Sequence, residues 1–118
     1  MSVTLAAARP PALGALGDRI AIQRRDVSAE DEGGAIATFV PVATVWARVR
    51  TLSSSRSQAA DGRGVTITHA VVLRYRTDIA PGDRLLFGGR SLEVIAAADL
   101  NGRRAWLSCT CSERQVTG

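Results

Sequence analysis

The segment VTITHAVVLRYR, from Val65 to Arg76, contains many β-branched residues and alternates between two kinds of face. Alternation with a period of two residues is typical of a β-strand that packs one face against a core. The segment therefore predicts a β-strand over residues 65–76. Its more apolar face is formed by every second residue, namely Val65, Ile67, His69, Val71, Leu73 and Tyr75.

The same period continues in both directions along the chain. Strand patterns cover Asp18–Arg25, Ala35–Arg50 and Arg103–Glu113. Pro41 lies inside the second of these and cannot donate a ladder hydrogen bond, so it indicates an edge, a bulge or a break. A further strand pattern, RSLEVIAAA, is expected to direct Leu92, Val94 and Ala96 to one face.

The stretch IAPGDRLLFGGRSLEVI, from Ile79 to Ile95, holds three glycines and two arginines that could suggest a phosphate-binding loop. Such a loop runs into a helix N-terminus, whose free N–H groups face the anion, and no helical pattern follows here. We therefore interpret the glycines as parts of turns between strands. Three residue pairs along the chain are typical of turns: Pro81-Gly82, Gly88-Gly89 and Asn101-Gly102.

These strands, with short turns and no convincing amphipathic helix, predict an all-β fold. We expect a small antiparallel β-barrel of about six strands, since 118 residues suffice for one core. A serine-rich stretch without an apolar period predicts a long irregular loop after the second or third strand. The expected boundaries are an extended N-terminal arm at 1–15, the barrel domain at 16–114 with its loop at 52–64, and a C-terminal tail at 115–118.

The positive charge of the chain comes from one residue type. All 15 basic residues are arginine, the net charge is +4, and the mean hydropathy is near zero. No apolar run approaches the roughly 20 residues that a spanning helix needs, so we expect a soluble globular chain. Arginine suits protein interfaces and nucleic acid alike, because it contacts carboxylates and phosphates and stacks on aromatic faces. A GC-rich genome would produce the same bias.

The sequence offers few residues for catalysis, and we expect no enzyme, no cofactor and no metal. His69 is the one histidine and lies on the apolar face of its strand, where a core imidazole is more common than a catalytic base. Cys109 and Cys111 share a face, but two thiols and one imidazole are too few for a metal site, and a disulfide at this spacing is awkward. We expect two buried thiols.

Tryptophan and arginine occur together on strand faces opposite the more apolar ones. This combination is favoured in protein interfaces, so we expect a subunit or partner interface there. Two other interpretations stay open: both indoles could be core residues, or they could be stacking platforms of a barrel that binds single-stranded nucleic acid. The expected interface residues are Trp46, Arg48, Arg50, Trp106 and Arg104.

The order of segments resembles a known family. GDRIAIQRRD is followed by the acidic turn DEGG, by TFVPVATVWARVR, by a polar loop, and by HAVVLRYRTDIAPGDRLLFGGRSLEVIAAADLNGRRAWLSCTCSE. From about Leu16 to Glu113 this collinear set is similar to the head-tail joining family, also called head closure or stopper proteins, of long-tailed phages and of phage-like gene transfer agents. The N-terminal arm before Leu13 is longer than the family pattern.

The resemblance implies a structural, non-enzymatic β-barrel protein that forms a homo-oligomeric ring with six-fold symmetry. The ring would lie at the head-tail junction of a virion or virus-like particle, and the particle would be assembled in the host cytoplasm. The ring would contact an adaptor ring of the portal complex on one side and tail terminator or tail tube proteins on the other, with no membrane. An alternative is that the chain is a neighbouring connector protein, either the adaptor or the tail terminator. The long loop would face the channel and help to retain packaged double-stranded DNA without sequence specificity. The channel-facing residues would be Ser53, Ser54, Ser55, Arg56 and Arg63.

Overall fold

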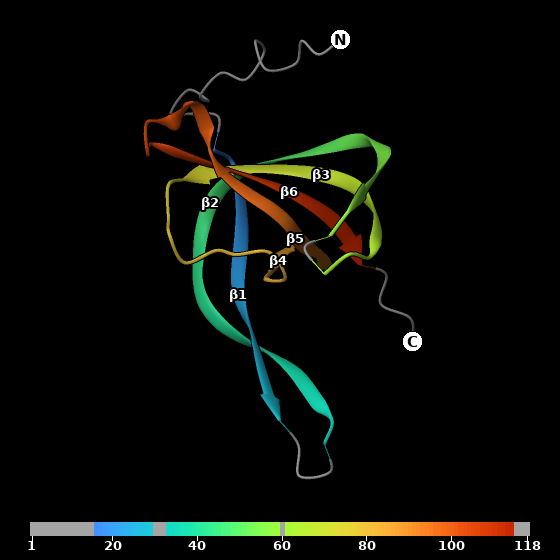
Figure 1. Ribbon diagram of the computed structural model, residues 1–118. Helices are drawn as coiled ribbons and strands as arrows, with labels where there is room; N and C mark the ends of the chain where they lie inside the picture. The colour runs from blue at the N-terminus through green and yellow to red at the C-terminus, as the bar shows by residue number, and fades with distance from the viewer. Residues whose placement is uncertain (1–15, 30–32, 60, 115–118) are drawn as a thin grey trace.

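A computed structural model describes residues 16–29, 33–59 and 61–114. The expected N-terminal arm at 1–15 and the C-terminal tail at 115–118 lie outside the described residues. Six strands and one short 3-10 turn, η3, make up the fold (Figure 1). Their bounds are β1 (Asp18–Ala29), β2 (Ala35–Gln58), β3 (Gly64–Arg74), β4 (Arg84–Phe87), β5 (Arg90–Asp99), η3 (Leu100–Gly102) and β6 (Trp106–Arg114).

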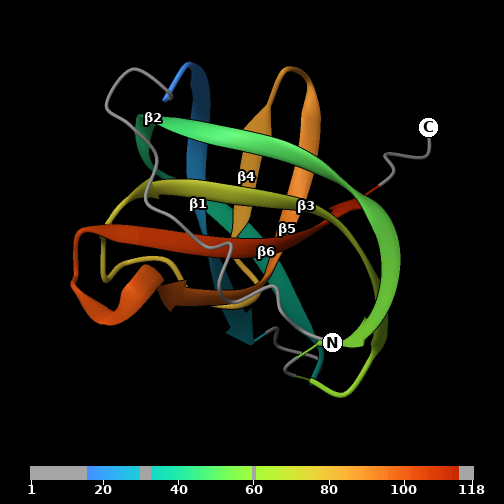
Figure 2. The ribbon, with the colours of Figure 1, turned by 90° about the horizontal axis from the view of Figure 1, so that it is seen from above.

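The strands form a closed barrel in the order β1-β2-β3-β6-β5-β4, and every neighbouring pair is antiparallel (Figure 2). The ring is closed by a short ladder in which Ala21–Gln23 of β1 pairs with Arg84–Leu86 of β4. The predicted all-β antiparallel barrel is therefore confirmed. No helix among the described residues is long and apolar enough to cross a membrane.

The barrel interior is filled by alternate residues of every strand. β3 shows the alternation most clearly, because its buried and half-buried positions follow one another over nine residues. Ile79, from the segment between β3 and β4, adds to the same core. The remaining buried core residues are Ile20, Ile22, Ala47, Val71, Leu73, Leu85, Leu92, Val94, Leu107, Cys109 and Cys111.

Two single-residue bulges, in β2 and in β5, interrupt the alternation. In β2, Ala43 pairs with Ile22 and Pro41 pairs with Gln23, so Val42 is an extra residue where proline cannot donate a ladder bond. In β5 the extra residue is Ile95. Because of this bulge, the core-facing residue after Val94 is Ala97, and the expectation that Ala96 shares the face of Leu92 and Val94 is wrong.

The turns contain glycines at positions with positive φ. Ala80–Asp83 is closed by an N–H of Asp83 that donates to the carbonyl of Ala80, with Gly82 at φ 97°, as a type II turn requires. Gly88 and Gly89 both have positive φ and join β4 to β5, as predicted. The two-residue hairpin expected at Asn101-Gly102 is wrong, because the link from β5 to β6 spans residues 100–105 and includes η3.

The β1–β2 hairpin extends well beyond the barrel (Figure 1). Past Gln23, β1 pairs only with β2, and β2 begins to pair with β3 only at Ala47. We call Arg24–Ala29 together with Ala35–Val40 the β1–β2 arm. The arm is a two-stranded ribbon that leaves the closed sheet on one side of the barrel.

The irregular loop expected at 52–64 is wrong. β2 continues to Gln58 and pairs with β3 up to Gly64, leaving only a short turn, and the irregularity is confined to a register shift between Thr51 and Ser55. The described side chains of residues 51–58 are exposed, so no hydrophobic period could mark the strand. Backbone pairing with β3 stabilises this part of β2 instead. We call residues 52–64 the β2–β3 hairpin.

Candidate functional site

The outer part of the β2–β3 hairpin presents a polar surface. Leu52, Ser53, Ser55 and Arg56 are exposed, and they follow one another along the end of β2. The side chain of Ser54 lies outside the described set. Four of the five residues expected in a channel-facing segment, Ser53 to Arg56, are therefore consecutive in β2.

Arg63, the fifth of those residues, is paired with carboxylates of its own chain. Its Nη2 donates to Glu93 Oε2 of β5 at 2.6 Å, and its Nε donates to Asp61 Oδ2 at 2.8 Å. Arg114 Nη1 donates to the other oxygen of Glu93 at 3.1 Å. Hydrogen bonding to Glu93, and then to Asp61, raises the pKa of Arg63. Arg63, expected as a cation of the channel-facing segment, is thus paired with two carboxylates of its own chain.

A small apolar cluster lies beneath the tip of the hairpin. It consists of Ala59, Val65, Ile67 and Ile95, and it is separate from the barrel core. Glu93 and Ile95 are both buried against the hairpin on one face of β5, while Leu92 and Val94 fill the barrel on the other. The hairpin is therefore anchored on β5 by an apolar contact and by the Glu93 ion pairs.

On the outside of the barrel, arginine and tryptophan alternate across four neighbouring strands. Arg19 of β1 pairs with Trp46 of β2, and Arg74 of β3 pairs with Trp106 of β6. The guanidinium carbons of Arg19 and Arg74 lie 4.7 Å and 5.2 Å from the centroids of Trp46 and Trp106, respectively. We call these four residues the Trp–Arg row. Cation–π contacts of this kind contribute about 0.5–1 kcal/mol each at exposed sites.

The expected interface residues are only partly brought together. Trp46 is 51% exposed, so the alternative that both indoles are core residues is wrong for Trp46, while Trp106 is half-buried. Arg48 and Arg50 are exposed on the face of Trp46. Arg104 lies in the link before β6, where its N–H donates to the carboxylate of Asp99. The arginines stacked on the indoles are Arg19 and Arg74, which only strand pairing reveals.

A hollow of about 780 Å³ lies beside the Trp–Arg row, at the end of the barrel where β1 begins. Its lining combines apolar residues with two arginines. We call it the end hollow, and it is lined by Leu16, Gly17, Val45, Trp46, Leu73, Arg74, Tyr75 and Arg76.

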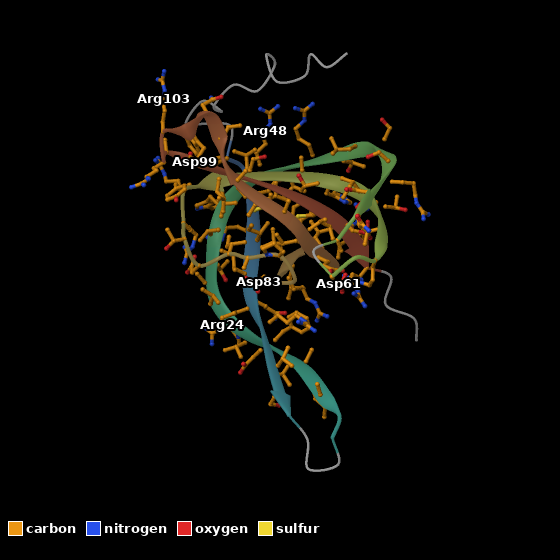
Figure 3. The ribbon with its side chains drawn as sticks, viewed as in Figure 1. Arg24, Arg48, Asp61, Asp83, Asp99 and Arg103 are labelled. Carbon is orange, nitrogen blue, oxygen red and sulfur yellow. The ribbon has the colours of Figure 1, made fainter. Side chains whose placement is uncertain are left out.

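A second, more polar hollow of about 370 Å³ lies between the arm, the β2–β3 hairpin and the Ala80–Asp83 turn. Arg84 covers the ring of Phe39 at 3.7 Å there. The carboxylate of Asp83 accepts from the N–H groups of Arg25 and Ala80, so it holds the turn against β1. Figure 3 labels Asp83 and Asp61, which both line this hollow.

His69 is a core residue, 2% exposed. Thr68 Oγ1 accepts the N–H of Glu113 and lies 2.8 Å from His69 Nδ1, within hydrogen-bond distance. Nε2 has no hydrogen-bond partner among the described residues. Within residues 16–29, 33–59 and 61–114, no three His, Cys, Asp or Glu side chains are grouped as a metal site would require.

This geometry, a small closed barrel with two projecting hairpins, was compared with known proteins. The family model of the phage head completion protein matches residues 12–114. The chain belongs to the phage head completion protein family. The resemblance to the head closure family is therefore confirmed, and the chain is a head-completion structural protein.

Solved structures share the fold of this head completion protein. The solution structure of protein SF1141 from Shigella flexneri 2a is 27% identical, with a TM-score of 0.62, and the match covers 86% of this chain and 95% of that one. A chain from the virion of a native gene transfer agent particle is 23% identical, with a TM-score of 0.63, and the match covers 90% and 98%. No curated protein matches.

The two cysteines of this head completion protein are buried and not joined. Burial raises the pKa of Cys109 from 9.0 to about 12, and burial together with the neighbouring Cys109 raises the pKa of Cys111. A rise from 9.0 to about 12 lowers the thiolate fraction of Cys109 by about a thousandfold at pH 8. We therefore expect both thiols to react with a thiol reagent at pH 8 at least about a hundredfold more slowly than in the urea-unfolded chain.

Burial of the same thiols predicts that the free energy of unfolding falls at alkaline pH. The unfolded chain loses these protons near pH 9 and the folded chain retains them to higher pH, so the unfolded state binds fewer protons in between. The free energy of unfolding should be unaffected by them below pH 9 and should fall as the pH rises above it. A Cys109→Ala, Cys111→Ala double variant should lose part of this slope, and an unchanged slope would contradict the burial argument.

Proposed function

We propose that this head completion protein is the stopper subunit of a phage or a gene transfer agent. In this proposal it forms a homo-oligomeric, six-fold ring at the head-tail junction, between the adaptor ring of the portal complex and the tail terminator or tail tube. Its role is structural, and it helps to retain packaged double-stranded DNA. The observation that carries the proposal is the β2–β3 hairpin, which is polar outside and anchored on β5 inside.

The chemistry of the hairpin suits a channel lining. Ser53 and Ser55 are small and neutral, and Arg56 is exposed. Among the described ion pairs, Arg56 has no carboxylate partner, whereas Arg63 is held by Glu93 and Asp61. A lining of this kind contacts phosphates without reading bases, because phosphate contacts carry no sequence information.

Binding of single-stranded nucleic acid is less favoured by the geometry. Bases stack on open aromatic faces in proteins that bind single strands. In the Trp–Arg row, Arg19 and Arg74 each cover one face of an indole, and Trp106 is half-buried. The row is better suited to contact with another protein surface.

The channel role predicts a specific effect of Arg56. Arg56→Glu should leave the free energy of unfolding of the isolated chain within about 0.5 kcal/mol of wild type, because the side chain is exposed. Particles that contain this variant should lose packaged DNA several times faster than wild-type particles, since the hairpin would repel phosphate. Nuclease-protected DNA per particle, followed over time after purification, measures this loss.

Arg90→Glu is the matched control, because it makes the same charge change at an exposed arginine beside the Gly88-Gly89 turn. Its particles should retain DNA as wild type does. If both variants retain DNA equally well, the hairpin does not face the DNA. If particles made without the gene for this chain join tails and keep their DNA, the stopper assignment itself is wrong.

A further inference from the structure

The Trp–Arg row is continuous across four neighbouring strands. Trp46 of β2 and Arg74 of β3 occupy adjacent positions, because the residues beside them, Ala47 and Leu73, are paired. Arginine and tryptophan therefore alternate over β1, β2, β3 and β6. Two more exposed arginines follow on the outer side of β2, and we call the row together with them, Arg48 and Arg50, the Trp–Arg face.

The Trp–Arg face carries no acidic residue. The four strands that form it contain three acidic residues in all. Asp18 directly precedes Arg19 and Glu113 directly follows Ser112, so both alternate with the outward positions of their strands. Asp26, the third, lies in the β1–β2 arm. The face is therefore a local concentration of positive charge.

The arginines of the face have no carboxylate partner within the described residues. None of them takes part in an ion pair there. Carboxylates close by in the fold bind backbone groups instead, since Asp18 accepts the N–H of Val49 at 2.9 Å and Asp99 accepts the N–H of Arg104 at 2.9 Å. The two arginines that lie over indoles keep the N–H groups at the edge of the guanidinium plane, which suit a carboxylate.

The end hollow places an apolar surface beside this charge. Its apolar lining is Val45, Leu73 and Tyr75. Trp46 and Arg74 belong both to the hollow and to the face, whereas Arg76 is paired with Asp78 at 2.8 Å. The volume of about 780 Å³ is within the range of clefts that bind ligands, about 300–1,000 Å³. A ligand that fits both parts has an apolar side chain for the hollow and negative charge for the face.

The spacing of the strands determines how long such a ligand must be. β1 and β3 flank β2, so the backbones that carry Arg19 and Arg74 are about 10 Å apart, which is two strand spacings. An extended segment advances about 3.3 Å per residue and spans this distance in about three residues. Trp46 lies between the two arginines. A short acidic segment with one apolar side chain can therefore contact both arginines and the hollow.

Double-stranded DNA is also negatively charged, but it fits this surface less well. Its phosphate backbone attracts arginine and offers no apolar side chain to fill the end hollow. Tryptophan with arginine is the combination that dominates binding energy in protein interfaces. Complementary charge at such an interface also selects the partner and speeds its encounter. The charge and the apolar lining together favour a protein.

We propose that the Trp–Arg face and the end hollow bind an acidic segment of a neighbouring virion protein. An apolar side chain of that segment fills the hollow, and its carboxylates bind Arg19, Arg48 and Arg74. This inference rests on the proposed place of the chain at the head-tail junction, and it names the chemistry by which the chain recognises its partner there.

Photo-cross-linking in assembled particles tests the occupant. Tyr75, in the wall of the hollow, is replaced by the photo-reactive residue p-benzoylphenylalanine, which is also aromatic. Irradiation should join position 75 to a segment of another virion protein in which Asp and Glu outnumber Lys and Arg, as identified by mass spectrometry of the linked peptide. The same replacement at Arg90, an exposed residue beside the Gly88-Gly89 turn, is the control and should not label that segment.

Each outcome of the cross-linking decides the inference. A link to an acidic segment of another virion protein confirms it. A link to residues 1–15 of this chain, to a second copy of the chain, to packaged DNA, or to a neutral or basic segment overturns it, and so does the absence of any link in particles that contain the variant. All of these results leave the stopper role intact. Particles from which the wild-type chain is absent overturn the proposed function instead.

Charge reversal tests the electrostatic part separately. Heads and tails are purified from cells that lack the gene for this chain and are treated with nuclease, so that binding of added chain does not depend on DNA. Arg19→Glu with Arg74→Glu should bind heads or tails at least about tenfold more weakly than wild type. Arg24→Glu with Arg90→Glu makes the same charge change at exposed arginines outside the face and should bind as wild type does. Equal binding by the two variants overturns the inference, and a wild-type chain that binds neither heads nor tails overturns the proposed function.

Truncation of Trp46 tests the apolar part. Trp46→Ala should weaken the same binding at least about tenfold, while the thermal unfolding of the isolated chain stays close to that of wild type because the indole is 51% exposed. Ile36→Ala is the matched control, since Ile36 is 44% exposed and lies in the β1–β2 arm. Unchanged binding of Trp46→Ala, or an equal loss with Ile36→Ala, overturns the inference.

Discussion

Leu85→Ala is expected to lower the free energy of unfolding by about 3 kcal/mol. Leu85 is fully buried and pairs with Ile22 of β1 and Leu92 of β5. It therefore lies in the short β1–β4 ladder that closes the ring of strands. Truncation would remove apolar burial and leave a cavity where the sheet has its fewest hydrogen-bonded pairs.

Urea unfolding followed by tryptophan fluorescence measures this loss. Leu52→Ala is the matched control, because the same atoms are removed from a side chain that is 37% exposed, and it should change the free energy of unfolding by less than about 0.5 kcal/mol. Equal effects of the two substitutions would show that the β1–β4 ladder does not depend on core packing at Leu85.

Glu93→Ala is expected to lower the free energy of unfolding by about 2 kcal/mol. Glu93 is 9% exposed and accepts hydrogen bonds from both Arg63 and Arg114, so its loss removes the contact that holds the hairpin turn on β5. Breaking a buried ion pair costs about 3–5 kcal/mol, and the cost is smaller here because both arginines are about half exposed and regain water.

Amide hydrogen exchange separates this local effect from a general loss of stability. In Glu93→Ala the amides of Ala59 and Gly62, which are bonded within the turn, should exchange faster than expected from the global change. Asp61→Ala removes an exposed partner of the same Arg63 and should leave the free energy of unfolding nearly unchanged. If both variants behave alike, Glu93 does not anchor the hairpin.

Much of the barrel follows from local pattern. The alternation of Val65 to Leu73 identifies β3, because burial of one face of a strand requires an apolar residue at every second position. Gly88-Gly89 identifies the hairpin between β4 and β5, because positive φ favours glycine. The β2–β3 hairpin has no such sequence pattern. Its outer strand is exposed, so hydrogen bonds to β3, which any residue but proline can make, determine its structure.

The candidate site is predictable only in part for a related reason. The sequence pattern places Trp46 correctly on an outer face, but it cannot select Arg19 and Arg74 as stacking partners, since they are distant in sequence and become neighbours through strand register. Likewise, Arg63 resembles a free cation in the sequence because Glu93 lies 30 residues away along the chain. Pairings across strands need the register, which one sequence does not reveal.

The extra residue at Val42 determines which way the β1–β2 arm faces. Side chains on a strand alternate between two faces, so one inserted residue exchanges the faces of everything beyond it and adds a local twist. The face of the arm on which Ile36 of β2 lies is thus set by a single position at the base of the arm. Loss or gain of one residue there would re-aim the arm without altering the barrel.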